Sequence, residues 1–150
     1  MTEVLSAPNI LEYTYTRTTG PVIGRFMTGL RDDRRIEGIR TGDGRVIVPP
    51  LEYDPATGES LSADDMVEVG SSGEVTTWAW VDQPRASQPL DRPFAYALIK
   101  LDGGDTAMLH VVDVGGKRSE MRTGMRVTAQ WREQREGSIL DIECFRPEAP

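Results

Sequence analysis

The segment "GEVTTWAWVD", residues 73–82, begins the β-rich part of the chain. It is dense in β-branched and aromatic residues, which favour strands. Four later segments share this character: "PFAYALIKLD" (93–102), "TAMLHVVDV" (106–114), "RVTAQWREQ" (126–134) and "SILDIECF" (138–145). The sequence therefore predicts five strands in its second half.

The separators between these segments predict how the strands connect. "GGD" at 103–105 and "REG" at 135–137 are short enough for hairpins, whereas "QPRASQPLDR" (83–92) and "GGKRSEMRTGM" (115–125) predict longer loops. Five strands in so short a span are too few for an immunoglobulin sandwich and fit a small, closed barrel of the OB type. We assign this barrel to residues 63–150.

A helix is predicted before the barrel, from Pro21 to Arg31. Apolar residues recur at spacings of three and four, and proline is favourable in the first turn. The apolar stripe has two possible partners, which are the rest of this chain and a partner subunit. We assign the helix and the polar arm before it to residues 1–35.

The segment "RTGDGRVIVPPLEYDPATGE", residues 40–59, has the layout of a zinc ribbon. Two turns, Arg40 to Gly44 and Asp54 to Gly58, each end in glycine, where a backbone with positive φ is expected. A proline-containing apolar stretch separates them. We assign the ribbon to residues 36–62 and expect "SLSADDMVEVGSSG" (60–73) to be a connector.

Composition restricts the class of protein. The 150 residues carry a net charge of −7, so the basic surface that binds a phosphate backbone is not expected. No apolar run is long enough to cross a membrane, and the N-terminus lacks the pattern of a signal peptide. The lone cysteine, Cys144, is expected to be a small apolar residue of the last strand. These features indicate a cytoplasmic protein.

Catalytic patterns are sparse. His110 lies in a strand with no recognisable nucleophile or orienting partner, which favours a structural histidine over a general base. Trp78 and Trp80 share one face of their strand, and that face can be core, a ligand platform or a protein interface. We find no nucleophile elbow, phosphate loop or dinucleotide fingerprint.

The chain resembles a known family in the order of its segments. "GRFMTGLRDDR" in the helix, "GRVIVPP" in the ribbon, and "RPFAYALIKLDGG" and "TGMRVTAQW" in the barrel resemble the family known as domain of unknown function thirty-five. The resemblance spans roughly residues 10–147 and implies a mainly β protein. Its expected parts are a short N-terminal helix, a rubredoxin-like ribbon and a five-stranded OB-fold barrel.

The resemblance also implies four zinc ligands, but this chain departs from the family at each one. The family's four cysteine positions correspond here to Arg40, Asp43, Asp54 and Thr57. Structural zinc needs soft or borderline donors, and a guanidinium in that shell would repel the ion. We therefore expect a metal-free, degenerate ribbon in which Arg40 pairs with Asp43 or Asp54.

Members of this family accompany thiolases and lipid-transfer-type thiolases. The resemblance thus implies a non-catalytic accessory subunit that binds a thiolase-like enzyme and assists acyl-CoA binding or transfer, in steroid side-chain or fatty acyl-CoA degradation. The helix and ribbon are expected at the partner interface, and Arg85, Arg92 and Phe94 near the coenzyme A. We expect no tightly bound cofactor and no nucleic acid. Two alternatives remain open: an OB-fold binder of single-stranded nucleic acid, and a self-sufficient acyl-CoA hydratase or aldolase.

Overall fold

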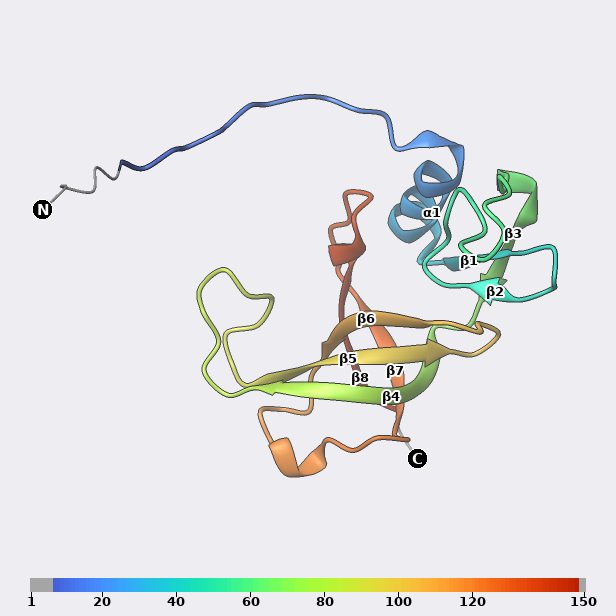
Figure 1. Ribbon diagram of the computed structural model, residues 1–150. Coiled ribbons are helices and arrows are strands. Elements are labelled where there is room, and N and C mark those ends of the chain that lie inside the picture. The colour runs from blue at the N-terminus through green and yellow to red at the C-terminus, as the bar shows by residue number, and fades with distance from the viewer. Residues whose placement is uncertain (1–6, 149–150) are drawn as a thin grey trace, which may run out of the picture.

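The structure is a computed structural model that describes residues 7–148 (Figure 1). A closed barrel forms from β4 (Ser72–Val81), β5 (Phe94–Leu101), β6 (Ala107–Val112), β7 (Arg126–Trp131) and β8 (Ile142–Pro147). The strands follow one another around the barrel in the order β4-β5-β6-β8-β7. All pairs are antiparallel except β6 with β8. The five predicted strands and the OB-type barrel are confirmed.

Alternation along the strands places the core. In β6, Met108, His110 and Val112 are buried, whereas Leu109 between them is 62% exposed. Ile99 and Phe145 are fully buried on the neighbouring strands. The period-two pattern of the sequence therefore identifies the inward face of the barrel correctly.

The helix α1 (Gly20–Asp33) includes the predicted range and extends it at both ends. Its apolar stripe, with Val22, Phe26 and Leu30, is fully buried against the rest of the chain. Of the two partners considered for this stripe, the chain itself is the one observed. The expectation that this stripe docks on a partner subunit is therefore wrong, because intramolecular packing already covers it.

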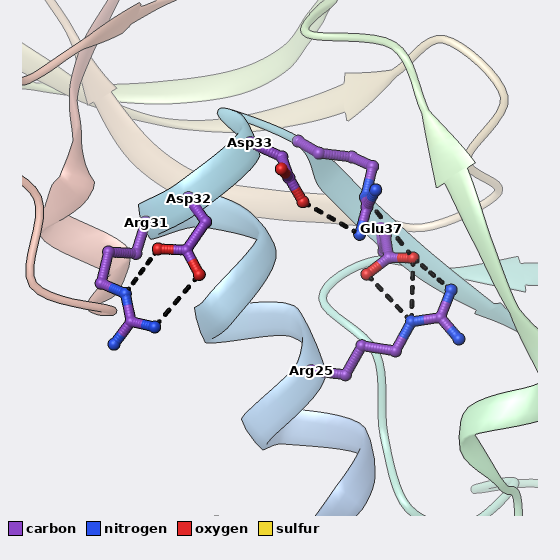
Figure 2. A network of polar contacts seen from close by, with 6 residues as sticks. Arg25, Arg31, Asp32, Asp33 and Glu37 are labelled. Carbon is purple, nitrogen blue, oxygen red and sulfur yellow. Dashed lines mark hydrogen bonds and ion pairs between the residues drawn. The ribbon is translucent and has the colours of Figure 1, made fainter.

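A buried carboxylate ties α1 to the strand that follows it (Figure 2). The side chain of Glu37 is only 2% exposed and accepts hydrogen bonds from the guanidinium of Arg25, with Nη2 at 2.6 Å from Oε1. Arg35 Nε lies 3.7 Å from the same oxygen. Arg31 and Asp32 form a separate pair at the exposed side of the helix. The Arg25–Glu37 contact fixes the orientation of α1.

The segment after α1 forms a second, smaller sheet. Strand β1 (Ile36–Arg40) is central, with β2 (Val46–Ile47) and β3 (Met66–Val69) antiparallel on either side. The region expected as a connector thus contains a 3-10 turn, Ala63–Asp65, and β3. That expectation is corrected: Met66 and Val69 are buried and pack as strand residues.

The barrel holds the small sheet through the β5–β6 hairpin. Asp105 donates its backbone N–H to the carbonyl of Val46 and accepts the Val46 N–H with its carboxylate at 2.9 Å. The hydroxyl of Thr106 contacts both the N–H and the carbonyl of Val48. The sheet and the barrel also share one apolar core. No helix among residues 7–148 has the length and hydropathy needed to span a bilayer.

Candidate functional site

The wall of the barrel is open between β6 and β8. In the described part of the chain, one residue pair, Val112 with Phe145, joins these strands. Before that pair the strands diverge, and the 3-10 turn Ile139–Asp141 occupies part of the space beside β6. The edge of β6 from Ala107 to Val111 consequently has no strand beside it on this side.

An apolar groove of about 250 Å³ lies at this opening. Its lining comes from β5, β6, the loop after β4 and the β7–β8 connection: Pro89, Tyr96, Leu109, His110, Val111, Ile139, Leu140 and Glu143. Leu109 and Leu140 are 62% and 47% exposed at its rim. This is the face on which OB-folds commonly bind ligands, between their second and third strands and the adjoining loops. Here its lining is mainly apolar.

His110 lines this groove from inside the barrel. Its ring stacks edge-to-face on Phe145 at 5.4 Å, and Nε2 lies 3.4 Å from the carbonyl of Ile139. Nδ1 is buried and completes no hydrogen bond with any described residue. Burial lowers the pKa of His110, although the carbonyls of Ile139 and Val111 act against this shift. The imidazole is thus neutral, and no carboxylate or nucleophile is hydrogen-bonded to it within residues 7–148, as expected for a structural histidine.

The three residues expected near coenzyme A lie in different environments. Arg85 is exposed in the loop between β4 and β5, and Arg92 at the end of that loop binds the buried carboxylate of Asp113 at 2.5 Å. Phe94 is fully buried with Val111 and Cys144 in a second apolar cluster apart from the main core, and its ring packs edge-on against Tyr96. The expectation of a contact from Phe94 is corrected, because its ring does not reach the surface.

Asp113 contacts two arginine side chains at one end of the barrel. Burial favours its neutral form, but hydrogen bonds from Arg92 and from the N–H of Gly115 outweigh burial, so the pKa of Asp113 lies below its ordinary value. Arg146 approaches the same carboxylate at 3.5 Å. Two guanidiniums therefore share one buried carboxylate, and Asp91 lies 3.7 Å from Arg92 as well, so these charges largely balance.

The two glycine turns of residues 40–59 have the expected backbone. Gly44 and Gly58 have φ of 87° and 77°, as predicted. The expected pairing of Arg40 is wrong: Arg40 donates to the carbonyl of Gly44. Arg45 takes the expected role, because its side chain points between the turns and contacts Asp43 at 2.6 Å and Asp54 at 3.8 Å.

The other positions that the resemblance aligns with zinc ligands make local contacts. Asp43 accepts hydrogen bonds from Thr41 and Arg45, which lower its pKa to about 2. Buried Asp54 accepts from the N–H of Ala56, and Thr57 from the N–H of Glu59. Among residues 7–148, no three His, Cys, Asp or Glu side chains gather as a metal site would require.

Trp78 and Trp80 are half-buried and pack against the main apolar core. Cys144 is fully buried in β8, and burial raises the pKa of its thiol. Its expected role as a small apolar strand residue is confirmed.

The groove itself was not predicted. Its one signal in the sequence is Leu109, an apolar residue at an outward position between inward Met108 and His110. Leu140 joins it from a separate segment, and that proximity depends on the barrel closure.

Comparisons with known proteins agree with this architecture. Residues 66–132 match the family described as "ChsH2, C-terminal OB-fold domain". No curated protein matches the chain.

Two solved structures have similar folds. A protein of unknown function from the DUF35 family of Sulfolobus solfataricus aligns with a TM-score of 0.60 and 18% identity, over 86% of this chain and 85% of that one. A chain of the structure described as "Ltp2-ChsH2(DUF35) aldolase" aligns with a TM-score of 0.58 and 23% identity, over 87% of this chain and 98% of that one. At these identities the neighbours establish the fold, and the match to residues 66–132 establishes the kind of domain. Residues 66–132 therefore resemble the C-terminal OB-fold domain of ChsH2, in a chain whose fold is that of the two DUF35 structures.

Proposed function

We propose that this chain is a non-catalytic accessory subunit of a thiolase-like, lipid-transfer-type enzyme and assists it with an acyl-CoA substrate. The observation that carries the proposal is the likeness to a DUF35 chain whose structure is described, together with Ltp2, as an aldolase. The match of residues 66–132 to the ChsH2 OB-fold domain supports the same association.

The chemistry of the described residues is consistent with catalysis by the partner. His110 is buried, and among residues 7–148 no acid, base or nucleophile is hydrogen-bonded to it, although Glu143 lines the same groove. General acid–base catalysis needs a group within hydrogen-bond reach of both the substrate and an orienting partner. A self-sufficient hydratase or aldolase is less well supported for this reason.

We assign the coenzyme A contacts to the end of the barrel where Arg85 and Arg92 lie. Arg85 is exposed and has a freely accessible guanidinium, whereas Arg92 is held by Asp113 and keeps 43% of its side chain exposed. Guanidiniums bind phosphate through paired hydrogen bonds. We assign to these two residues, and not to Phe94, a contact with the phosphates of the acyl-CoA.

The test is reconstitution. The chain is purified from its native cells under gentle conditions, the co-eluting enzyme is identified by mass spectrometry, and acyl-CoA cleavage is measured for each component and for the mixture. We expect cleavage by the complex and none by this chain alone. A chain that cleaves acyl-CoA without a partner, or that elutes with no enzyme subunit, would exclude an accessory role.

The arginine contact has its own test within the reconstituted complex. Arg85→Ala is expected to raise KM for acyl-CoA by roughly threefold to tenfold with little change in kcat, because the phosphate contact is present in the ground state and the transition state. Arg132→Ala, at another exposed arginine, is the matched control. Equal KM values for the two variants would rule out the contact.

Nucleic acid is the less favoured ligand. The groove on the OB ligand face has an apolar lining with Glu143 as its one charged residue, whereas single-stranded nucleic acid requires a basic groove with stacking aromatics. A binding assay at low salt distinguishes the two classes of ligand.

A further inference from the structure

The free edge of β6 is a place where another strand can add. Residues Ala107 to Val111 pair with β5 on one side and have no strand on the other side within residues 7–148. The apolar groove lies directly beside this edge. An edge with unpaired backbone groups and an adjacent apolar groove is the acceptor that β-strand addition uses.

The N-terminal arm has the composition of such a strand. In "LEYTYT", residues 11–16, Leu11, Tyr13 and Tyr15 alternate with polar residues and therefore share one face when extended. These three side chains are 86%, 71% and 73% exposed. The arm runs as an extended segment away from α1 and lies on neither sheet (Figure 1).

We infer that the arm of one chain adds as a strand to the β6 edge of a second copy and places its apolar face in that copy's groove. By two-fold symmetry the second arm covers the first groove, so each copy is both donor and acceptor. This inference is independent of the enzyme partner proposed above.

The groove and the arm are chemically complementary. Leu109 and Leu140 at the rim provide apolar surface for Leu11 and an aromatic ring. His110 also contributes to the lining of the groove, but its Nδ1 is buried, so the complementarity between arm and groove rests on apolar surface.

The course of the arm favours a second copy over the chain's own groove. The arm runs away from α1 and lies on neither sheet of its own chain (Figure 1). Reciprocal exchange also buries both arms. Three large side chains per arm, with the groove surfaces they cover, give on the order of 2,000 Å² for the pair, which is the size of a stable interface.

The first experiment measures mass by light scattering and sedimentation over a wide range of chain concentration. The wild-type chain is expected to be a dimer. Tyr13→Ser combined with Tyr15→Ser removes the donor, and Leu109→Ser or Leu140→Ser alters the acceptor at exposed positions that leave the core intact. Each change is expected to weaken the dimer by roughly tenfold to a hundredfold. Tyr53→Ser, at a 55% exposed tyrosine outside both regions, is the control and should remain dimeric.

A mixing experiment identifies the exchange itself. A chain with the altered arm and a chain with Leu109→Ser are each expected to be largely monomeric alone. Their mixture restores one intact contact, because the intact arm of the second chain meets the intact groove of the first. The mixture should therefore dimerise more tightly than either variant.

Three results would overturn the inference. They are a wild-type chain that is monomeric at all concentrations, a dimer that survives the arm changes, and a mixture no tighter than its components. A monomer whose arm is nevertheless protected from hydrogen exchange would show docking within one chain in place of exchange.

Discussion

Arg25 of α1 reaches Glu37 of β1 across the helix–sheet junction, and the carboxylate it contacts is almost completely buried. Removing one member of such a pair leaves a buried charge without its main partner. Arg25→Ala is therefore expected to lower the free energy of unfolding by about 1–3 kcal/mol, a value reduced by the partial exposure of Arg25.

Urea unfolding checks this expectation. Arg31→Ala, which breaks the exposed pair with Asp32, is the control and should cost less than about 0.5 kcal/mol. Arg25→Met with Glu37→Leu should recover most of the loss, because apolar residues of similar size need no partner. Equal effects of Arg25→Ala and Arg31→Ala would contradict the importance of the buried carboxylate.

His110 predicts a loss of stability in mild acid. Because burial lowers its pKa in the folded state, the unfolded chain binds a proton first as pH falls. The contribution of His110 to the free energy of unfolding is fully present above its pKa in the unfolded chain, about 6.5. It decreases as pH falls from there toward the lower pKa of the folded state. The urea midpoint of the wild type minus that of His110→Phe should decrease over this window. A flat difference would mean that the ring titrates equally in both states.

Asp43 predicts a measurable titration within the first glycine turn. Its pKa of about 2 results first from the hydroxyl of Thr41 and then from Arg45. Thr41→Val and Arg45→Ala should each raise the pKa, as measured by carboxyl chemical shifts in NMR, because each change removes one of the side-chain hydrogen bonds. A variant that leaves the pKa unchanged would contradict the role of that hydrogen bond.

Gly44 predicts a backbone effect that is independent of packing. A Cβ at this position would meet no atom within 4 Å, yet φ is +87°. Gly44→Ala should cost about 1 kcal/mol through backbone strain alone. Gly42→Ala, nearby without a positive φ, is the matched control. Chemical denaturation compares them, and similar costs would refute the strain argument.

The retained turns predict that a metal site can be rebuilt. Arg40→Cys, Asp43→Cys, Asp54→Cys and Thr57→Cys together restore four thiolates at the family's ligand positions, and the variant should bind one zinc ion per chain. Elemental analysis after gel filtration measures the metal content, with the natural chain as the comparison. A variant that stays free of zinc would show that the turns no longer converge.

The fold was largely predictable because most of its elements depend on local patterns. Runs of β-branched and aromatic residues identified the five barrel strands, and the spacing of Val22, Phe26 and Leu30 identified the helix. The strand Met66–Val69 was missed, since its pairing with Ile36–Arg40 depends on residues about 30 positions earlier in the chain.

The site was less predictable because its geometry is not local. Arg40 was expected to bridge the two glycine turns, but Arg45 does so in the structure. Which of the two side chains faces the gap between the turns depends on the folded backbone. Phe94 and Arg92 are two residues apart, but Phe94 is buried in an apolar cluster with Val111 and Cys144, whereas Arg92 is held at the surface by Asp113. Sequence proximity alone did not distinguish them.

The hairpin contact between Asp105, Thr106 and the strand Val46–Ile47 affects how this protein tolerates change. Because the barrel holds the small sheet through backbone groups of Val46 and Val48 and through a shared apolar core, the attachment of the sheet does not depend on the side chains at the turn tips. Substitutions of Arg40, Asp43 or Thr57 should therefore leave the sheet attached, whereas a change at Asp105 removes one of the contacts that couple the two parts.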